Sequence, residues 1–468
     1  MKTEFGLVGL GVMGKSLSRN LAQKGFSLSL FNRHVRNLEE DVAVKFINMF
    51  DELSNCKGYD RIHEFVLSLE KPRKIFLMIK AGEAIDQQLE ELSTFLDSGD
   101  IIIDGGNSHY RDTLQRIEML ATRGIRFIGA GISGGESGAL KGPSIMPGGD
   151  SDGYDQVKKY LEAIAAKDKN GESCCTYIGP QGSGHFVKMV HNGIEYAEMQ
   201  LIAEVYSILR YGMGINPGQI ANEFSSWGKT ALNSYLLEIT IQILKKKEKE
   251  DWLVDKILDK AVNKGTGSWT SIAAAELGVP IPTLTAALHA RFLSFFKDER
   301  LAAHKLFNSN SSNQDAVINI STDHVKHAYQ LARIINHHQG FHLLETASRE
   351  YGWELKLPQI ARIWTNGCII RSELMETLSR ILPENPHVLL HHKIQQAFTK
   401  GEKLNETVST AIQADIHIPC LSSASNYLTG YTTAESSANI IQAQRDYFGA
   451  HTYKRIDDPE GKPHHTEW

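Results

Sequence analysis

The sequence has no long hydrophobic run, few cysteines and no large excess of charge of either sign. Its 468 residues include five cysteines, none in a CxxC pair. An odd number of thiols in a chain of this size favours reduced cysteines and a cytoplasmic protein over a disulfide framework. The net charge is −5 without a basic block, so nucleic acid is not an expected partner. No apolar stretch approaches the ~18 residues of a membrane span, and no signal peptide or membrane association is expected.

The first part of the chain alternates short apolar stretches with amphipathic ones. This alternation predicts a parallel sheet covered by helices on both faces, a Rossmann-like α/β domain over residues 1–181. The expected strands are residues 5–9, 27–31, 75–79, 101–104, 127–130 and 176–178, and the expected helices include 13–24, 84–96 and 110–122.

From residue 182 onward the pattern becomes helical. Residues 187–211, 235–246 and 286–307 have helical periodicity, which predicts a large all-α domain over 182–436. Tyr211-Gly212 and Tyr351-Gly352 are each followed, at the same offset, by Gln-Ile-Ala, which indicates either an internal duplication or a coincidence. Residues 437–468 form a polar C-terminal tail rich in rings and cations, and we expect this tail to dock onto another surface.

A glycine-rich turn at the first predicted strand indicates a nucleotide site. Gly9, Gly11 and Gly14 complete a GxGxxG pattern that follows a strand and opens a helix. The glycines permit a tight turn, a close approach of pyrophosphate and close helix–strand packing, while the helix N-terminus attracts phosphate. The alternative is a glycine-rich turn without a ligand.

The end of the second predicted strand discriminates between the two nicotinamide coenzymes. NAD-binding chains usually have an acidic residue there for the ribose 2′-hydroxyl. This chain has Asn32 and Arg33, and a guanidinium can pair with a 2′-phosphate. NADP is therefore the expected coenzyme, unless Arg33 is only a solvated surface residue.

A polar stripe on one predicted helix is the candidate catalytic group. Relative to Lys188, the residues His191, Asn192 and Glu195 are i+3, i+4 and i+7 and share one helix face, with Tyr196 at its edge. The stripe combines a base, an acid and hydrogen-bonding groups directly after the nucleotide domain, where a cleft is expected. The alternative is a solvated face with a Lys–Glu pair.

Several ordered motifs resemble the 6-phosphogluconate dehydrogenase family over nearly the whole chain. They are DGGNS at 104–108, SGGE at 133–136, GPS at 142–144, MPGG at 146–149, the 188–196 helix, KGTG at 264–267 and IIQAQRDYFGAHTY at 440–453. The resemblance implies a Rossmann domain, a duplicated helical domain and a tail that completes the active site of the second subunit of a homodimer. It also implies NADP-dependent oxidation and decarboxylation of 6-phosphogluconate to ribulose 5-phosphate, a reaction of the pentose phosphate pathway and of gluconate utilization.

The resemblance assigns roles to individual residues. Lys188 is similar to the family's general base and Glu195 to its general acid. The implied cofactor contacts are Gly9, Gly11, Val12, Met13, Gly14, Asn32, Arg33, Lys80 and Asn107. The implied substrate contacts are Asn107, Ser133, Gly134, Gly135, His191, Asn192, Tyr196, Lys264, Thr266 and Arg291, together with Arg445 and His451 from the neighbouring subunit.

The chain also departs from the family pattern and leaves alternatives open. Ser268 stands where a second lysine is usual, and His34 where threonine is common; Thr365-Asn366, Thr432 and Ser437 differ as well. No metal is expected, because the paired histidines are not in a recognisable ligand motif. The competing functions are a related β-hydroxyacid dehydrogenase acting on another acid, and a catalytically inactive NADP-binding protein.

Overall fold

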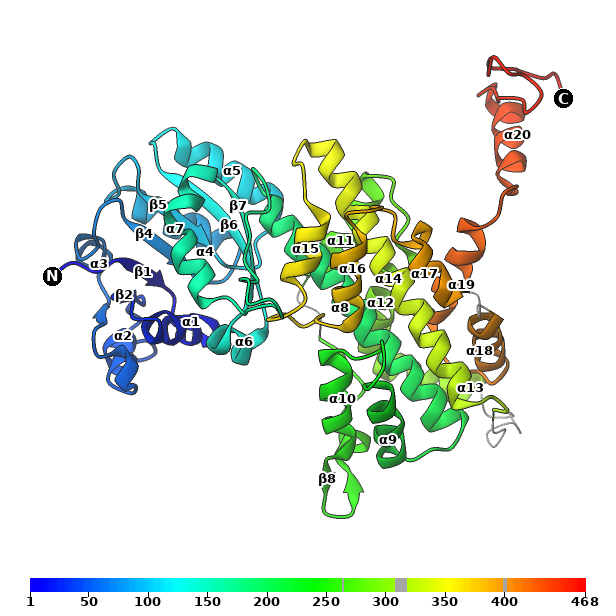
Figure 1. Cartoon of the computed structure of the whole chain (residues 1–468), viewed down its shortest axis with the longest axis horizontal. Helices are drawn as coiled ribbons and strands as arrows, with labels where there is room; N and C mark the ends of the chain where they lie inside the picture. The colour runs from blue at the N-terminus through cyan, green and yellow to red at the C-terminus, as the bar shows by residue number, and fades with distance from the viewer. Residues whose placement is uncertain (263–264, 308–317, 399–401) are drawn as a thin grey trace.

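The protein consists of an α/β domain, a large helical domain and a projecting tail (Figure 1). The computed structural model describes residues 1–262, 265–307, 318–398 and 402–468. Within these residues, no helix is long and apolar enough to cross a membrane. The predicted fold class, a Rossmann-type domain followed by an all-α domain, is confirmed.

The α/β domain is built on a seven-stranded sheet of order β3-β2-β1-β4-β5-β6-β7. Every pairing from β3 through β6 is parallel, but β7 runs antiparallel to β6. The expectation of a purely parallel sheet is therefore wrong at this edge. The short connection through α6 returns the chain beside β6, whereas a parallel pairing needs a longer crossover. The strands are β1 Phe5–Val8, β2 Leu28–Phe31, β3 Lys57–Tyr59, β4 Lys74–Leu77, β5 Ile101–Asp104, β6 Arg126–Ser133 and β7 Ser144–Gly149.

The expected strand at residues 176–178 is also wrong. Here the chain makes only an isolated bridge between Ile145 and Cys175, followed by a hydrogen bond from the Ile178 N–H to the Pro147 carbonyl. The segment lies along β7 without continuing its ladder. Its apolar side chains are therefore buried by packing rather than by membership of the sheet.

Helices cover both faces of the sheet. Successive strand residues face opposite sides, and because both sides are apolar here, both have to be buried. Phe5 and Leu7 of β1 belong to one buried cluster, while Val8 belongs to another on the opposite face. The helices of this domain are α1 Val12–Gln23, α2 Val42–Ile47, α3 Ile62–Leu67, α4 Glu83–Ser93, α5 Tyr110–Ala121, α6 Gly135–Lys141 and α7 Ser151–Ile164, with a 3₁₀ turn at Asp51–Leu53.

Two long helices, α8 and α14, form the centre of the helical domain and pack against each other. The N-terminal half of α8 is apolar or buried almost all round, so it is enclosed by protein on every side. The helices are α8 Ser183–Ser207, α9 Pro217–Trp227, α10 Tyr235–Lys245, α11 Thr266–Glu276, α12 Pro282–Phe295, α13 Lys297–Phe307, α14 Thr322–Tyr351, α15 Leu357–Ile363, α16 Glu373–Ile381, α17 His392–Phe398, α18 Glu402–Gln413 and α19 Pro419–Tyr431; a hairpin joins β8 Lys247–Glu248 to β9 Asp251–Trp252, and shorter turns lie at Ile208–Gly212, Leu253–Lys256 and Val388–Leu390.

The helical repeat seen in the sequence corresponds to a repeated set of helices. The series α8, α9, α10 is matched by α14, α15, α16. Ser234 caps α10 and Ser372 caps α16, and the two serines face each other in an antiparallel bridge. The flanking hydrogen bonds are reciprocal: the Tyr235 N–H donates to the Arg371 carbonyl and the Glu373 N–H to that of Asn233. This local two-fold arrangement agrees with a duplication.

Two predicted helices have different limits in the structure. The stretch 286–307 is divided into α12 and α13, because Phe296 leaves the helical conformation. The charged segment that follows is held separately, with Lys297 and Arg300 both paired to Asp259. The stretch 187–211 begins earlier, at Ser183, and its last turn widens to a π-helix.

The N-terminus of α19 is held by a buried carboxylate on α8. Glu204 is 1% exposed and accepts the backbone N–H groups of Cys420 and Leu421, both at 2.8 Å. These N–H groups have no partner inside their own helix, so the carboxylate replaces a helix cap. Burial raises the pKa of Glu204 to about 7.

The tail projects away from the helical domain (Figure 1). It contains α20, Ala438–Gly449, and a return segment organised around Asp446, which is 0% exposed. Asp446 accepts hydrogen bonds from the Thr452 and Thr466 N–H groups and from the indole of Trp468. The outer surface of the tail stays apolar and exposed, at Ile440, Ile441, Tyr447 and Phe448.

Candidate active site

The candidate catalytic helix lies directly on the last two strands of the sheet. A Cβ atom at Gly131 of β6 would come within 2.3 Å of the Lys188 Cβ, and one at Gly184 of α8 within 2.4 Å of the Gly129 carbonyl. Only glycine allows this close approach. As a result, α8 passes the carboxyl end of the sheet, where ligands bind in open α/β folds.

Lys188 is the centre of a buried hydrogen-bond network. Its side chain is 7% exposed, and its Nζ atom donates to the Asn192 Oδ1 at 2.6 Å. The same Nζ lies 3.4 Å from the Nδ1 of His191, whose Nε2 lies 3.2 Å from the Ser133 hydroxyl. The spacing along one helix face therefore brings Lys188, His191 and Asn192 together as the sequence predicted, and β6 adds Ser133.

Burial favours the neutral forms of both nitrogen bases. It lowers the pKa of the Lys188 ammonium, and the charge of Glu195 opposes this shift. It also lowers the pKa of His191 well below its ordinary range, with the positive charge of Lys188 as the second cause. A neutral amine beside a neutral imidazole can accept a proton from a substrate hydroxyl.

Glu195 lies one turn beyond His191 on the same face. Its Oε2 atom is 3.7 Å from the His191 Nδ1, and its side chain is 20% exposed. The carboxyl group therefore has contact with solvent, whereas Lys188 is enclosed. Seven residues of helix, about two turns or ~10 Å, separate the backbones of Lys188 and Glu195. Their functional groups nevertheless converge on the Nδ1 of His191, which lies 3.4 Å from the Lys188 Nζ and 3.7 Å from the Glu195 Oε2.

Cys368 and Trp364 lie next to Lys188 and His191 in the protein interior, and sequence reasoning missed both. The Cys368 thiol is buried near Lys188, and burial raises its pKa to about 12, so it stays protonated. The Trp364 ring meets the His191 ring edge-on at 5.4 Å between centroids. No periodicity of the sequence relates Trp364 or Cys368 to α8.

Arg291 lies over the ring of Tyr196. Its guanidinium carbon is 3.6 Å from the ring centroid, and its Nη2 atom lies 3.4 Å from the Met199 sulfur. The alternative role for Arg291 is a surface ion pair with Asp298 or Glu299, which lie nearby in the sequence. Across the ranges that the structure describes, Arg291 forms no salt bridge, so this alternative is wrong there.

The loops at the ends of β5 and β6 carry further predicted contacts. Gly134 and Gly135 begin α6 with φ angles of 120° and 63°, which other residues rarely adopt. Asn107 is exposed in a turn at the end of β5. Asp104 fixes this turn by accepting the Gly106 N–H at 2.9 Å and the Ser108 hydroxyl at 2.6 Å.

A cavity of about 650 Å³ opens at the carboxyl ends of β1, β2 and β4. The predicted contacts Gly9, Gly11, Asn32, Arg33 and Lys80 line it, and so does Glu39, which the sequence reasoning missed. Because Glu39 follows the strand within a charged segment, only its contacts identify it as part of the site.

The glycine-rich turn fits a dinucleotide. A Cβ atom at Gly14 would lie 1.9 Å from the Gly9 carbonyl, which explains the close helix–strand contact. At Gly11 a Cβ would meet nothing within 4 Å, so the backbone is open to a phosphate. The first turn of α1 has no side-chain cap and no acidic residue. Val12 is exposed there, while Met13 packs against the core beneath the sheet.

Some predicted contacts are not brought to Lys188 within one chain. Arg445 and His451 are exposed on the projecting tail (Figure 1). Thr266 begins α11, and Lys264 lies outside the described residues.

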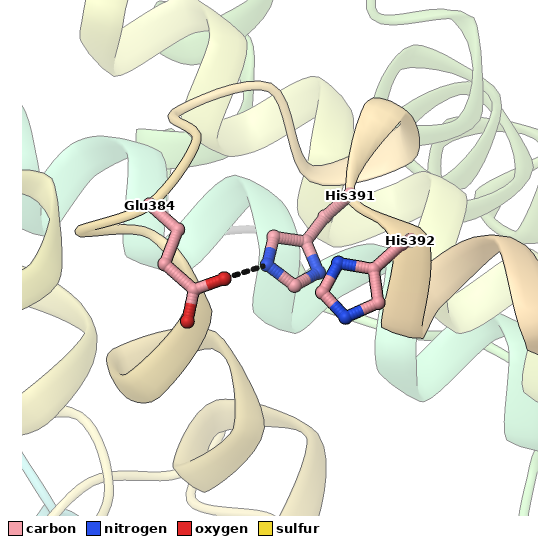
Figure 2. A group of neighbouring side chains, drawn as sticks. All are labelled: Glu384, His391 and His392. Carbon is pink, nitrogen blue, oxygen red and sulfur yellow. Dashed lines mark hydrogen bonds and ion pairs between the residues drawn. The ribbon is translucent and has the colours of Figure 1, made fainter.

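Glu384, His391 and His392 form a group with potential metal ligands, and Figure 2 shows their arrangement. The His391 Nε2 lies 3.0 Å from a Glu384 oxygen, and its Nδ1 accepts the Lys393 N–H at 3.2 Å. With Nδ1 as acceptor, Nε2 carries the proton and donates to Glu384. The sequence did not foresee this carboxylate, because seven residues and a turn separate it from the histidines.

Two family models match the two domains. Residues 4–179 match the NAD binding domain of 6-phosphogluconate dehydrogenase, and residues 184–468 match the C-terminal domain of the same enzyme. The chain belongs to the 6-phosphogluconate dehydrogenase family.

Full-length relatives and one solved structure agree with this membership. The decarboxylating 6-phosphogluconate dehydrogenase of Escherichia coli is 45% identical over 472 residues, covering 100% of this chain and 99% of that protein. The Haemophilus influenzae enzyme is 42% identical over 475 residues, covering 100% and 97%. The Plasmodium falciparum enzyme, solved in its apo form and in complexes with NADP⁺ and with 6-phosphogluconate, has a TM-score of 0.93 at 39% identity and covers 99% of this chain and 100% of its own.

Proposed function

We propose that the protein oxidises 6-phospho-D-gluconate with NADP and releases CO2, giving D-ribulose 5-phosphate and NADPH. The observation that carries this proposal is the buried Lys188 network, in a chain of this family that also has a cavity lined by its glycine-rich turn. A proton acceptor, a proton donor and a coenzyme site are the three parts that the reaction requires.

Lys188 acts first as the general base. Its neutral amine accepts the proton of the sugar's 3-hydroxyl, and NADP, when bound, accepts the hydride from C3. Burial lowers the pKa of Lys188 and so favours the neutral form that this step needs. Asn192 accepts a hydrogen bond from Nζ at 2.6 Å, which fixes the direction of the amine.

The protonated Lys188 then assists decarboxylation. The oxidised substrate is a β-keto acid, and the ammonium donates a hydrogen bond to the C3 oxygen while negative charge develops there. As the bond from C2 to the carboxyl carbon breaks and CO2 leaves, Lys188 passes its proton to the C3 oxygen, and a neutral enediol remains. Glu195 then delivers a proton to the former C2, while Lys188 takes back the proton of the adjacent hydroxyl and the ketone forms. The solvent contact of Glu195 provides a route for its reprotonation.

The phosphate of the substrate requires cations at the far end of the site. Arg291, held flat by Tyr196, supplies one, and Lys264 a second. We propose a homodimer in which the partner subunit's Arg445 and the partner subunit's His451 complete the site. The projecting tail with its exposed apolar residues supports this arrangement, because such a surface is unfavourable in water without a partner. The five reduced, buried cysteines support a cytoplasmic location.

A panel of acids and coenzymes tests the function. The purified protein is incubated with 6-phosphogluconate, gluconate or small 3-hydroxyacids, each with NADP or NAD, and both reduced coenzyme and CO2 are measured. We expect equal amounts of NADPH and CO2 from 6-phosphogluconate, and little from gluconate because it lacks the phosphate. Turnover of other acids without CO2, or coenzyme binding without turnover, would replace this proposal with one of the two competing functions.

A further inference from the structure

Every basic side chain at the ribose end of the nucleotide cavity, apart from Lys80, has an acidic neighbour among the described residues. Arg33 lies 3.3 Å from Glu39, His34 lies 3.7 Å from Asp60, and Arg61 lies 3.5 Å from Glu64. All but Glu64 line the cavity. A 2′-phosphate that enters this end therefore meets carboxylates as well as cations.

Glu39 forms hydrogen bonds with Asn32 and Arg33, the residues that are expected to contact the 2′-position of the coenzyme. Its Oε2 atom accepts the Asn32 amide at 2.8 Å, and its Oε1 atom accepts the Arg33 guanidinium at 3.3 Å. The Oδ1 of Asn32 in turn accepts the Leu10 N–H of the glycine-rich turn at 3.1 Å. The hydrogen bonds from Asn32 and Arg33 lower the pKa of Glu39, so its carboxylate is ionised at neutral pH.

The two nicotinamide coenzymes interact differently with such a carboxylate. The 2′-phosphate of NADP carries negative charge and needs the same Arg33 and Asn32 donors that Glu39 occupies. The 2′-hydroxyl of NAD is a donor, and a carboxylate is its usual acceptor in dinucleotide-binding folds. Glu39 therefore weakens the binding of the NADP 2′-phosphate and can accept a hydrogen bond from the NAD 2′-hydroxyl.

We propose that Glu39 determines coenzyme discrimination by competing with the 2′-phosphate for Asn32 and Arg33, which lowers the preference for NADP over NAD. This inference rests on the proposed NADP-dependent function. It assigns Glu39 a positioning role: the carboxylate acts through the two donors and is displaced from them when the phosphate binds.

Two substitutions separate this competition from a general change of charge. Glu39→Gln removes the charge and keeps the shape. Glu40→Gln makes the same change one residue away, where the carboxylate accepts the Asn37 N–H at 2.8 Å and has no other hydrogen bond within the described part of the chain. Binding of 2′-phospho-AMP and of AMP, which share the adenosine 5′-phosphate and differ at the 2′-position, is measured by calorimetry for the wild type and both variants.

We expect Glu39→Gln to bind 2′-phospho-AMP about three- to tenfold more tightly than the wild type, as for the loss of one like charge at a solvated site. Its affinity for AMP should stay the same or fall, and Glu40→Gln should leave the ratio of the two affinities unchanged. Weaker binding of 2′-phospho-AMP by Glu39→Gln would overturn the inference, because Glu39 would then only orient Arg33. Equal changes in 2′-phospho-AMP affinity in Glu39→Gln and Glu40→Gln would overturn the inference as well.

Turnover gives a second, independent comparison. The ratio of kcat/KM with NADP to kcat/KM with NAD should rise about three- to tenfold in Glu39→Gln. If the wild type shows no turnover of 6-phosphogluconate with either coenzyme, the proposed function fails, while the binding experiment still decides the role of Glu39. If turnover is normal and the ratio is unchanged, the inference fails and the proposed function stands.

Discussion

Replacing Asn192 with aspartate should raise the pKa of Lys188 and move the acid limb of the activity profile to higher pH. The Asn192 Oδ1 lies 2.6 Å from Nζ, so the new carboxylate would sit against the amine in a site that is 8% exposed at Asn192. An opposite charge this close raises the pKa of a lysine by about 1–3 units. This corresponds to about 1.4–4 kcal/mol of added preference for the charged form.

The assay is the pH dependence of kcat/KM for 6-phosphogluconate. Because Lys188 must be neutral to accept a proton, kcat/KM falls tenfold for each unit by which the pH lies below its pKa. In Asn192→Asp the acid limb should move up by about 1–3 pH units, with a loss of about 10- to 1,000-fold at a fixed pH on that limb.

Two control variants separate charge from the loss of a contact. Asn192→Ala removes the hydrogen bond without adding charge, so its limb should stay close to that of the wild type although activity falls. Glu195→Gln removes the charge that opposes the lowered pKa of Lys188, so its limb should move to lower pH. An acid limb that does not move in Asn192→Asp, or that moves down, would refute Lys188 as the base.

Three further predictions concern the coenzyme, the stability and the tail. Arg33→Ala should lose NADP affinity and keep most of whatever NAD affinity exists, as measured by binding titration; equal losses of both would contradict a 2′-phosphate contact. Because burial raises the pKa of Glu204 from 4.5 to about 7, the folded protein holds a proton that the unfolded chain releases, so the free energy of unfolding should fall as pH rises from 4.5 through 7. Glu204→Gln should remove this contribution, up to about 3 kcal/mol, from urea unfolding curves measured across that range; an unchanged pH slope would contradict it. Mixed dimers of Lys188→Met and Arg445→Ala should regain about a quarter of wild-type activity if tails are exchanged, since half the dimers would then have one intact site. No recovery on mixing would indicate that each tail serves its own chain.

The parts of the fold that depend on local patterns followed from the sequence. The turn at Gly9, Gly11 and Gly14 has a defined spacing, and strand alternation and helical period locate β1, β2, β5 and α1 to within a residue or two. The stripe from Lys188 to Asn192 was also predictable, because residues three and four apart on a helix are neighbours.

Features that depend on contacts between distant segments did not follow from the sequence. The antiparallel direction of β7 is set by the short connection through α6, and the break at Phe296 is a local departure from an otherwise helical pattern. Cys368 faces Lys188 from 180 residues away along the chain, and Glu39 is one acidic residue among several until its bonds to Asn32 and Arg33 are known. Composition and periodicity contain no information on such pairs.

The role of the buried amine is tested most directly by comparing the wild type with Lys188→Met on 6-phosphogluconate labelled at C1. NADPH is measured by absorbance and labelled CO2 by trapping, while NADP binding is measured separately as the control for folding. We expect equal molar amounts of the two products from the wild type and a loss of both by at least about 1,000-fold in the variant, with NADP binding retained. A Lys188→Met variant that keeps turnover within about tenfold of the wild type would contradict the central role of the buried amine.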